Sequence, residues 1–250
     1  MNKIVAVGLD NLPLIKEGQN LGEVIYKALI EKGMSLEEGD IIVVTEKIVA
    51  KSEGRVIELS CISPSEKAKR LAEEIGKDPR LIEIILNESN EIVKKGRGFI
   101  ISETKHGFIC ANAGIDQSNV ENGKVKLLPT DPDRSAEKIR RFLEKKFKVK
   151  VGVVISDSWG RPFRKGSVGV AIGASGIDAL KDRRGDVDLF GKKLKSTRVA
   201  VGDCIASLGI LLMGEAGEKI PVVIIRGLGK YLGRGRAIDL IRNKEEDLFR

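Results

Sequence analysis

Histidine and cysteine, which most often bind zinc or act as nucleophiles, are scarce in this 250-residue chain. A single histidine, His106, excludes a site built from several histidines and argues against Ser-His-Asp catalysis. The three cysteines, Cys61, Cys110 and Cys204, lie far apart, and no pair has the spacing of a zinc knuckle. We therefore expect neither a zinc site nor a disulfide framework, and interpret the cysteines as small buried apolar side chains in a reducing compartment.

Long apolar segments are also absent. The longest apolar runs, such as residues 151–155 and 222–225, have the length of strands, whereas a transmembrane helix needs about 20 residues. Residues 1–5 lead directly into a strand pattern, without the apolar core of a signal peptide. We therefore expect a protein that does not enter a membrane and stays in the cytoplasm.

Aromatic residues make up only 4% of the chain, although its net charge is +8. Proteins that stack nucleic-acid bases need aromatic side chains, and here the basic residues are interleaved with acidic ones. Small molecules that carry phosphate explain the basic bias equally well. The composition therefore favours a globular protein that binds no nucleic acid, and a hydrophobic fraction of 42% is sufficient for a substantial core.

Strand and helix patterns alternate in the first half of the chain and become irregular in the second. Apolar runs predict strands at residues 4–7, 41–45, 98–102, 108–112, 125–128, 149–156 and 221–226. Helical spacing and capping residues predict helices at residues 21–29, 131–147 and 203–213. They also predict a helix that Pro64 begins after the cap Ser63 and that ends near Gly76, and one after Asp78 whose buried face extends to Ile92 and Val93. The adjacent short strands predict a mixed α/β, or α+β, architecture with antiparallel pairing and flanking helices, neither a Rossmann nor a P-loop fold. We expect one domain over residues 1–250, with any subdivision near residues 129–133.

Three acidic residues follow elements that have the pattern of buried structure. Asp157 ends the longest apolar strand, Asp116 follows another strand and a glycine turn, and Glu215 stands between glycines after an apolar helix. A buried carboxylate must cap a helix, pair with an arginine or bind a cation, because desolvating it alone costs roughly several kcal/mol. Pairing of Asp157 with Arg161 or Arg164, and capping by Asp116, remain open alternatives. If the three acids meet, they form an oxygen site suited to Mg²⁺ or Mn²⁺.

The signals for phosphate binding are unusual, because the chain contains no G-x-x-x-x-G-K-[ST] motif and therefore no P-loop. The glycine-containing segment 227–233 misses the dinucleotide-binding spacing by one residue, and we interpret it as a plain loop. Lys47 and Lys51, four residues apart after a predicted strand, are better candidates for phosphate contacts, with a solvated turn as the alternative. Asn119 would share a face with Asp116 if a helical turn begins there.

These residues belong to sequence blocks that resemble one protein family. The blocks are Gly39–Ile41, Ala50–Arg55, Asn112–Val120, Ser156–Arg161, Gly166–Gly176 and Leu211–Glu215. They are similar to the coenzyme F-420:L-glutamate ligases of archaea, also called F-420-0 gamma-glutamyl ligases. The resemblance covers essentially the whole chain. The blocks Asn112–Val120 and Ser156–Arg161, which contain Asp116 and Asp157, are specific to it.

The resemblance implies a GDP-forming reaction that uses GTP to add L-glutamate, through gamma linkages, to the deazaflavin precursor of the coenzyme. It also implies Mg²⁺ or Mn²⁺, with two ions expected, a monovalent activator such as K⁺, and a homodimer. The implied metal ligands are Asp116, Asp157, Ser158 and Glu215, and Asp116 and Asp157 are also the implied catalytic residues. The implied GTP contacts are Asp10, Asn11, Leu12, Pro13, Glu46, Lys47, Lys51, Asn119, Ile210, Leu211, Leu212, Met213, Gly214, Glu215, Ala216 and Gly217. Arg161, Arg164 and Lys165 are candidates to bind the phosphate and carboxylates of the acceptor, with structural pairing as the alternative.

A mechanism consistent with these residues transfers a phosphoryl group from GTP to the terminal carboxylate of the acceptor. The amine of glutamate then attacks the resulting acyl phosphate. This chemistry needs metal ions and cationic side chains around the phosphates, and it needs no histidine or cysteine nucleophile. Two other classes remain open: a metal-dependent phosphohydrolase or phosphotransferase that uses the same acids, and a basic nucleic-acid-binding protein without catalysis.

Overall fold

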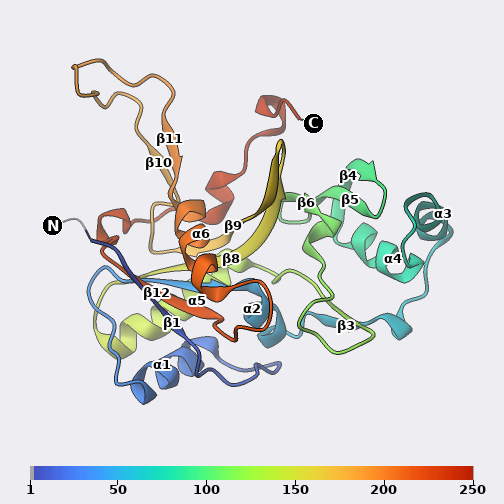
Figure 1. The fold of residues 1–250 in the computed structure, drawn as a ribbon, viewed down its shortest axis with the longest axis horizontal. Helices are drawn as coiled ribbons and strands as arrows, with labels where there is room; N and C mark the ends of the chain where they lie inside the picture. Colours follow the sequence, from blue (N-terminus) through green and yellow to red (C-terminus); the bar gives the residue numbers. More distant parts are fainter. Residues whose placement is uncertain (1–2, 250) are drawn as a thin grey trace.

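The computed structural model describes residues 3–249 and is built around a five-stranded sheet (Figure 1). The strand order is β1-β12-β2-β8-β9, and within this sheet only β2 and β8 pair in parallel. The strands are β1 (Val5–Leu9), β12 (Val222–Arg226), β2 (Ile41–Thr45), β8 (Gly152–Arg161) and β9 (Arg164–Ser175). The predicted mixed architecture with antiparallel pairing is therefore confirmed.

Helices cover both faces of the sheet, which explains why its central strands are continuously apolar. Alternate residues of β2 enter two different cores. Ile42 packs in the core that includes α1 (Leu21–Glu31) and α5 (Pro132–Phe147), and Val43 packs in the core that includes α6 (Val201–Met213). None of the helices in the described part of the chain is long and apolar enough to cross a membrane.

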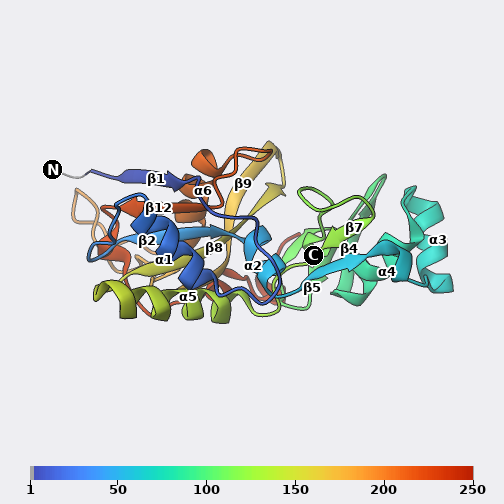
Figure 2. The ribbon, with the colours of Figure 1, turned by 90° about the horizontal axis from the view of Figure 1, so that it is seen from below.

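Residues 56–128 form a small lobe at one end of the elongated molecule (Figure 2). The lobe has an apolar core of its own, a three-stranded antiparallel sheet and a two-stranded ribbon. Its elements are β3 (Val56–Glu58), α3 (Glu66–Ile75), α4 (Pro79–Asn87), β4 (Ser89–Gly96), β5 (Phe99–Thr104), β6 (Ile109–Ala111) and β7 (Lys124–Lys126). The short helix α2 (Glu46–Ser52) leads from the main sheet toward this lobe, and residues 129–131 lead back to α5.

The helix that begins after Asp78 ends earlier than its apolar spacing predicts. Helix α4 stops at Asn87, and Ile92 and Val93 belong to β4, which pairs with β5. The prediction that the buried face of this helix reaches Ile92 and Val93 is therefore wrong. Ser89 and Asn90, which follow the helix, have low helix propensity, and pairing with β5 satisfies the backbone of this segment instead.

Two antiparallel ribbons extend beyond the body of the protein. Strands β8 and β9 continue past the sheet and turn back at residues 161–164. Strands β10 (Leu180–Asp182) and β11 (Arg198–Ala200) form the base of a longer arm, residues 183–197, which projects away from the rest of the chain (Figure 1).

Candidate functional site

A cavity of about 490 Å³ lies where the parallel pairing of β2 and β8 ends, at Thr45 and Ser156. Thr45 lines it from the end of β2, and residues 156–158 line it from β8. Other lining residues come from α2, from the segment 10–15 and from residues 210–221. Parallel strands end at the same edge of a sheet, which is where open α/β sheets usually bind ligands. The fold therefore collects residues that are distant in sequence around one cavity.

Helix α2 contributes Lys47 and Lys51, which are one turn apart and share a face of the helix. The ammonium of Lys47 lies 3.0 Å from Oδ2 of Asp116 and donates to the Ser118 hydroxyl at 2.7 Å. The ammonium of Lys51 donates to the backbone carbonyl of Asn119 at 2.6 Å. The two lysines therefore hold a loop of the small lobe against the cavity.

Asp116 is connected to the cavity through Lys47. Its carboxylate also accepts hydrogen bonds from the backbone N–H and the hydroxyl of Ser118, at 2.8 and 2.5 Å. Burial alone would raise the pKa of Asp116, but the two bonds from Ser118 and the charge of Lys47 lower it to about 2. Asp116 is therefore ionised at neutral pH.

Asp157 and Ser158 are neighbours on β8, so their side chains lie on opposite faces of the strand. The carboxylate of Asp157 accepts hydrogen bonds from the backbone N–H of Ser158 at 2.8 Å and from the Trp159 indole at 2.7 Å. The Ser158 hydroxyl donates to Oε2 of Glu215 at 2.9 Å, which ties the loop after α6 to the sheet. Gly214 ends α6 with φ of 69°, a conformation that favours glycine, and so turns the chain toward this contact.

The side chains around the cavity have the chemistry of a site for a hard divalent cation. Asp157, Ser158 and Glu215 offer only carboxylate and hydroxyl oxygens, which Mg²⁺ and Mn²⁺ prefer. Within residues 3–249, however, no three Asp, Glu, His or Cys side chains lie close enough together to form a metal-binding cluster. The carboxylate of Asp116 contacts Lys47 instead. The donor atoms therefore fit such an ion, whereas the three acids form no preassembled cluster.

Comparison with known proteins identifies the family. Residues 10–227 match the model of the family described as F420-0:Gamma-glutamyl ligase. The chain belongs to this family. It is 54% identical to the coenzyme F420:L-glutamate ligase of Methanocaldococcus jannaschii over 250 residues, which are 99% of this chain and 97% of the relative. The corresponding ligase of Methanothermobacter thermautotrophicus is 49% identical over 99% of each chain, and that of Archaeoglobus fulgidus is 45% identical over 97% of this chain and 94% of its own.

Most residues implied by the gamma-glutamyl ligase resemblance to contact GTP do line the cavity. They are Asp10, Leu12, Pro13, Lys47, Lys51, Asn119, Ile210, Met213, Gly214, Glu215, Ala216 and Gly217. The Asn119 side-chain amide donates to the backbone carbonyl of Ala216 at 3.3 Å, so the small lobe and the loop after α6 meet at the cavity.

Four of the implied GTP contacts lie outside the cavity lining. The side-chain amide of Asn11 donates to the backbone carbonyl of Ala28 in α1 at 3.0 Å. Leu211 and Leu212 lie on other faces of α6, because successive residues of a helix are rotated by about 100°, and Leu211 is 81% exposed. Glu46 is buried beneath the cavity, in a contact that the sequence does not predict.

That contact is with Lys126, a residue that the sequence analysis missed. Each of the two side chains is 1% exposed, and the Lys126 ammonium lies 2.5 Å from Oε2 of Glu46. Oε1 of Glu46 is buried and has no partner within residues 3–249. Burial raises the pKa of Glu46 to about 7 although Lys126 opposes the change, and Asp157 raises it further. Burial lowers the pKa of Lys126, but the nearby acids more than offset this effect. The only sequence signal is a lysine inside the apolar run 125–128.

The three basic residues predicted to bind the acceptor lie at the turn of the β8–β9 ribbon, outside the cavity. Arg161 donates from Nη1 to the backbone carbonyl of Gly166 at 3.0 Å, and Arg164 and Lys165 begin the return strand. Within the described residues neither arginine pairs with Asp157, so the ion pair considered as an alternative role for Asp157 is not formed. Binding of the acceptor by these residues remains a prediction.

Proposed function

We propose that this protein is a GTP-dependent ligase that joins L-glutamate to a carboxylate of a deazaflavin coenzyme precursor. One observation carries the proposal. In a chain 54% identical to a coenzyme F420:L-glutamate ligase over almost its full length, two lysines, two acids and a serine from separate elements meet at one cavity.

The cavity is suited to a nucleoside triphosphate. Lys47 and Lys51 supply positive charge for the phosphates, and apolar lining residues such as Ile48, Ile210 and Ile220 offer a surface for the base. The volume of about 490 Å³ lies within the usual range of small-molecule sites.

Divalent metal is part of this proposal, and Asp157, Ser158 and Glu215, together with Asp116, would hold it. When bound, Mg²⁺ or Mn²⁺ would neutralise phosphate charge. The protein itself positions these donors through the bonds of Asp157 to β8 and of Ser158 to Glu215. It also brings Lys47 beside Asp116, so a phosphate-binding cation and a candidate metal ligand are in direct contact.

In the proposed reaction, a carboxylate oxygen of the acceptor attacks the γ-phosphorus of GTP, the bond to the β–γ bridging oxygen breaks, and GDP leaves. The amine of glutamate then attacks the acyl carbon, the phosphate leaves, and the amine releases a proton. Lys47 and Lys51 would stabilise the negative charge on the transferred group, because they are fixed in place before the reaction.

We also propose that the protein forms a homodimer through its projecting arm. Leu189 and Phe190 in the arm are 99% and 95% exposed. Two large apolar side chains so exposed on a projecting segment are best explained by burial against a second copy. Light scattering should show a dimer for the wild type and a monomer for Leu189→Ser/Phe190→Ser, and a wild type that is monomeric at micromolar concentration would refute this assembly.

The activity is tested by incubating the protein with GTP, Mn²⁺ and glutamate, with and without the deazaflavin precursor. GDP release that requires both glutamate and the precursor supports the ligase. Release without either indicates a phosphohydrolase, and no release together with salt-sensitive DNA binding indicates a nucleic-acid-binding protein. Lys51→Gln should raise the KM for GTP about tenfold or more, whereas Lys67→Gln, at an exposed position of α3, should leave it unchanged.

A further inference from the structure

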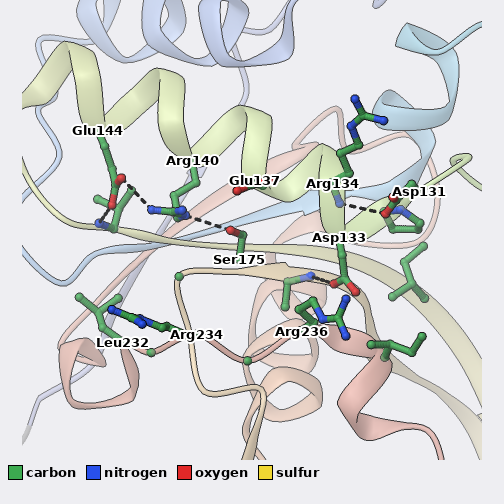
Figure 3. A pocket seen from close by; sticks show the side chains of 18 of the residues that line it. Asp131, Asp133, Arg134, Glu137, Arg140, Glu144, Ser175, Leu232, Arg234 and Arg236 are labelled. Atoms are coloured by element: carbon green, nitrogen blue, oxygen red, sulfur yellow. Dashed lines mark hydrogen bonds and ion pairs between the residues drawn. The ribbon is translucent and has the colours of Figure 1, made fainter.

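A second and larger cavity, of about 1100 Å³, lies between α5, the carboxyl end of β9 and the loop of residues 232–236 (Figure 3). It shares no lining residue with the cavity where the parallel pairing of β2 and β8 ends. None of the residues assigned above to GTP, metal or acceptor lines it, so the proposed function leaves its charged side chains without an assigned role.

The loop that closes this cavity has the sequence Gly233-Arg234-Gly235-Arg236. Both glycines pack against the backbone of residues 177–179, where a Cβ on either would lie within 2.9 Å of a backbone nitrogen. Only glycine fits at these two positions. The packing of the two glycines fixes the backbone of the loop without help from the arginine side chains.

Arg234 and Arg236 have no hydrogen-bond or ion-pair partner for their guanidinium groups within the described part of the chain. The contrast with Arg140 in the same cavity is clear in Figure 3, where Arg140 is joined to both Glu144 and Ser175, at 2.7 and 2.9 Å. Two guanidinium groups on a rigid loop, with all their donors free, are therefore available to a ligand.

The cavity also contains five acids, so its net charge alone does not select an anion. Each of these acids already accepts at least one hydrogen bond or ion pair. Asp131 accepts from the N–H of Arg134, Asp133 from the N–H groups of Ala174 and Ala237, and Glu38 from the N–H of Lys150, while Glu137 pairs with Arg141 and Glu144 with Arg140. None of these bonds involves the guanidinium groups of Arg234 and Arg236, which therefore remain the free cationic donors on the loop.

We propose that this cavity is a second anion-binding site, for a small molecule that carries at least two phosphate or carboxylate groups, with Arg234 and Arg236 as its principal ligands. Guanidinium groups bind both kinds of group with paired, charge-assisted hydrogen bonds. His106 lines the same cavity, where its Nε2 lies 3.1 Å from the backbone carbonyl of Thr130 and its buried Nδ1 has no partner among the described residues.

A row of aromatic side chains connects this site to Asp157. The rings of His106 and Phe108 are stacked at 5.8 Å, and those of Phe108 and Trp159 meet edge to face at 5.6 Å. The indole of Trp159 donates to Asp157. Phe108 and Trp159 also line a third, smaller cavity, with a volume of about 200 Å³. A polyanion at Arg234 and Arg236 is therefore either the distal part of a long substrate that reaches Asp157 or a separate small molecule.

Binding is measured by isothermal titration calorimetry of the full chain with inorganic pyrophosphate, so the test does not depend on ligase activity. The Arg234→Gln/Arg236→Gln variant should lose one class of pyrophosphate sites, with affinity at least about tenfold weaker. Lys47→Gln/Lys51→Gln should retain that class. The matched control, Arg70→Gln/Arg97→Gln, removes the same charge from exposed positions of the small lobe and should bind as the wild type does.

Steady-state kinetics then distinguishes the two sources of the anion. For a substrate group, Arg234→Gln/Arg236→Gln raises the KM of the deazaflavin acceptor about tenfold or more and leaves the KM of GTP unchanged. For a separate small molecule, both KM values are unchanged and only pyrophosphate binding is lost. Pyrophosphate binding by Arg234→Gln/Arg236→Gln equal to that of the wild type, with circular dichroism showing a native fold, overturns the proposal whether or not the protein is a ligase.

Discussion

Replacing Lys126 with methionine tests the buried ion pair that joins the small lobe to the main sheet. The ammonium of Lys126 contacts Glu46 at the start of α2, and its backbone forms two hydrogen bonds with Asp116. The substitution keeps an unbranched side chain, one heavy atom shorter, but removes the ion-pair partner of buried Glu46, whose Oε1 already has no partner among the described residues. Removing one member of such a buried pair costs about 3–5 kcal/mol of unfolding free energy.

The loss should depend on pH, because Glu46 can be protonated. With Lys126 present its pKa is raised to about 7, and without the lysine it rises further. A pKa raised in the folded state contributes stability that is present at low pH and is lost as the pH rises through the folded value. At about pH 6 Glu46 is largely protonated in both proteins, whereas above about pH 7 only the wild type can ionise it beside a cation. The destabilisation should therefore grow from about pH 6 to about pH 8.5.

Urea unfolding followed by circular dichroism at these two pH values measures the effect. Lys124→Met is the matched control, because Lys124 lies two residues earlier on β7 and pairs with Glu121, which is 78% exposed. This variant should lose about 1 kcal/mol or less of unfolding free energy. The double variant Glu46→Leu/Lys126→Met removes both charges and should recover most of the loss. The reasoning fails if Lys126→Met is as stable as Lys124→Met at high pH, or if the double variant is no more stable than Lys126→Met.

Three further predictions concern the proposed site and the cysteines. Asp157→Asn should reduce GDP formation at least about a hundredfold with an unchanged circular dichroism spectrum, and full activity would remove Asp157 from the catalytic site. The pKa of Asp116 is lowered to about 2, so its ionised form contributes stability above about pH 4 that is lost as the pH falls toward 2; urea unfolding should show that Asp116→Asn differs from the wild type less at pH 2 than at pH 6, and an equal difference would contradict this. The prediction that all three cysteines are buried holds for Cys110, whose pKa burial raises to about 12, and is wrong for Cys61 and Cys204, which are exposed. A thiol reagent should therefore titrate Cys61 and Cys204 in the folded protein and Cys110 only after unfolding.

Local sequence patterns were sufficient for much of the fold and for the family. The apolar runs at 41–45 and 221–226 became central strands of the sheet, and Asp131 followed by Pro132 begins α5 as predicted. These features depend on the neighbouring residues alone, because periodicity and capping act over one or two turns. The same patterns placed two lysines one helical turn apart on α2. The prediction that the strand ends before Asp157 is wrong, because β8 continues to Arg161 by pairing with β9, which local apolarity does not show.

How these elements meet depends on the packing of the folded chain. The sequence of α6 does not show that Ile210 and Met213 face the cavity while Leu211 faces solvent, because that depends on how the helix is rotated against the sheet. The pairing of Lys126 with Glu46 joins residues 80 positions apart. The local sequence around each residue does not distinguish it from an ordinary surface charge. Long-range contacts of this kind depend on packing between whole elements, whereas periodicity and capping report only what each segment does alone.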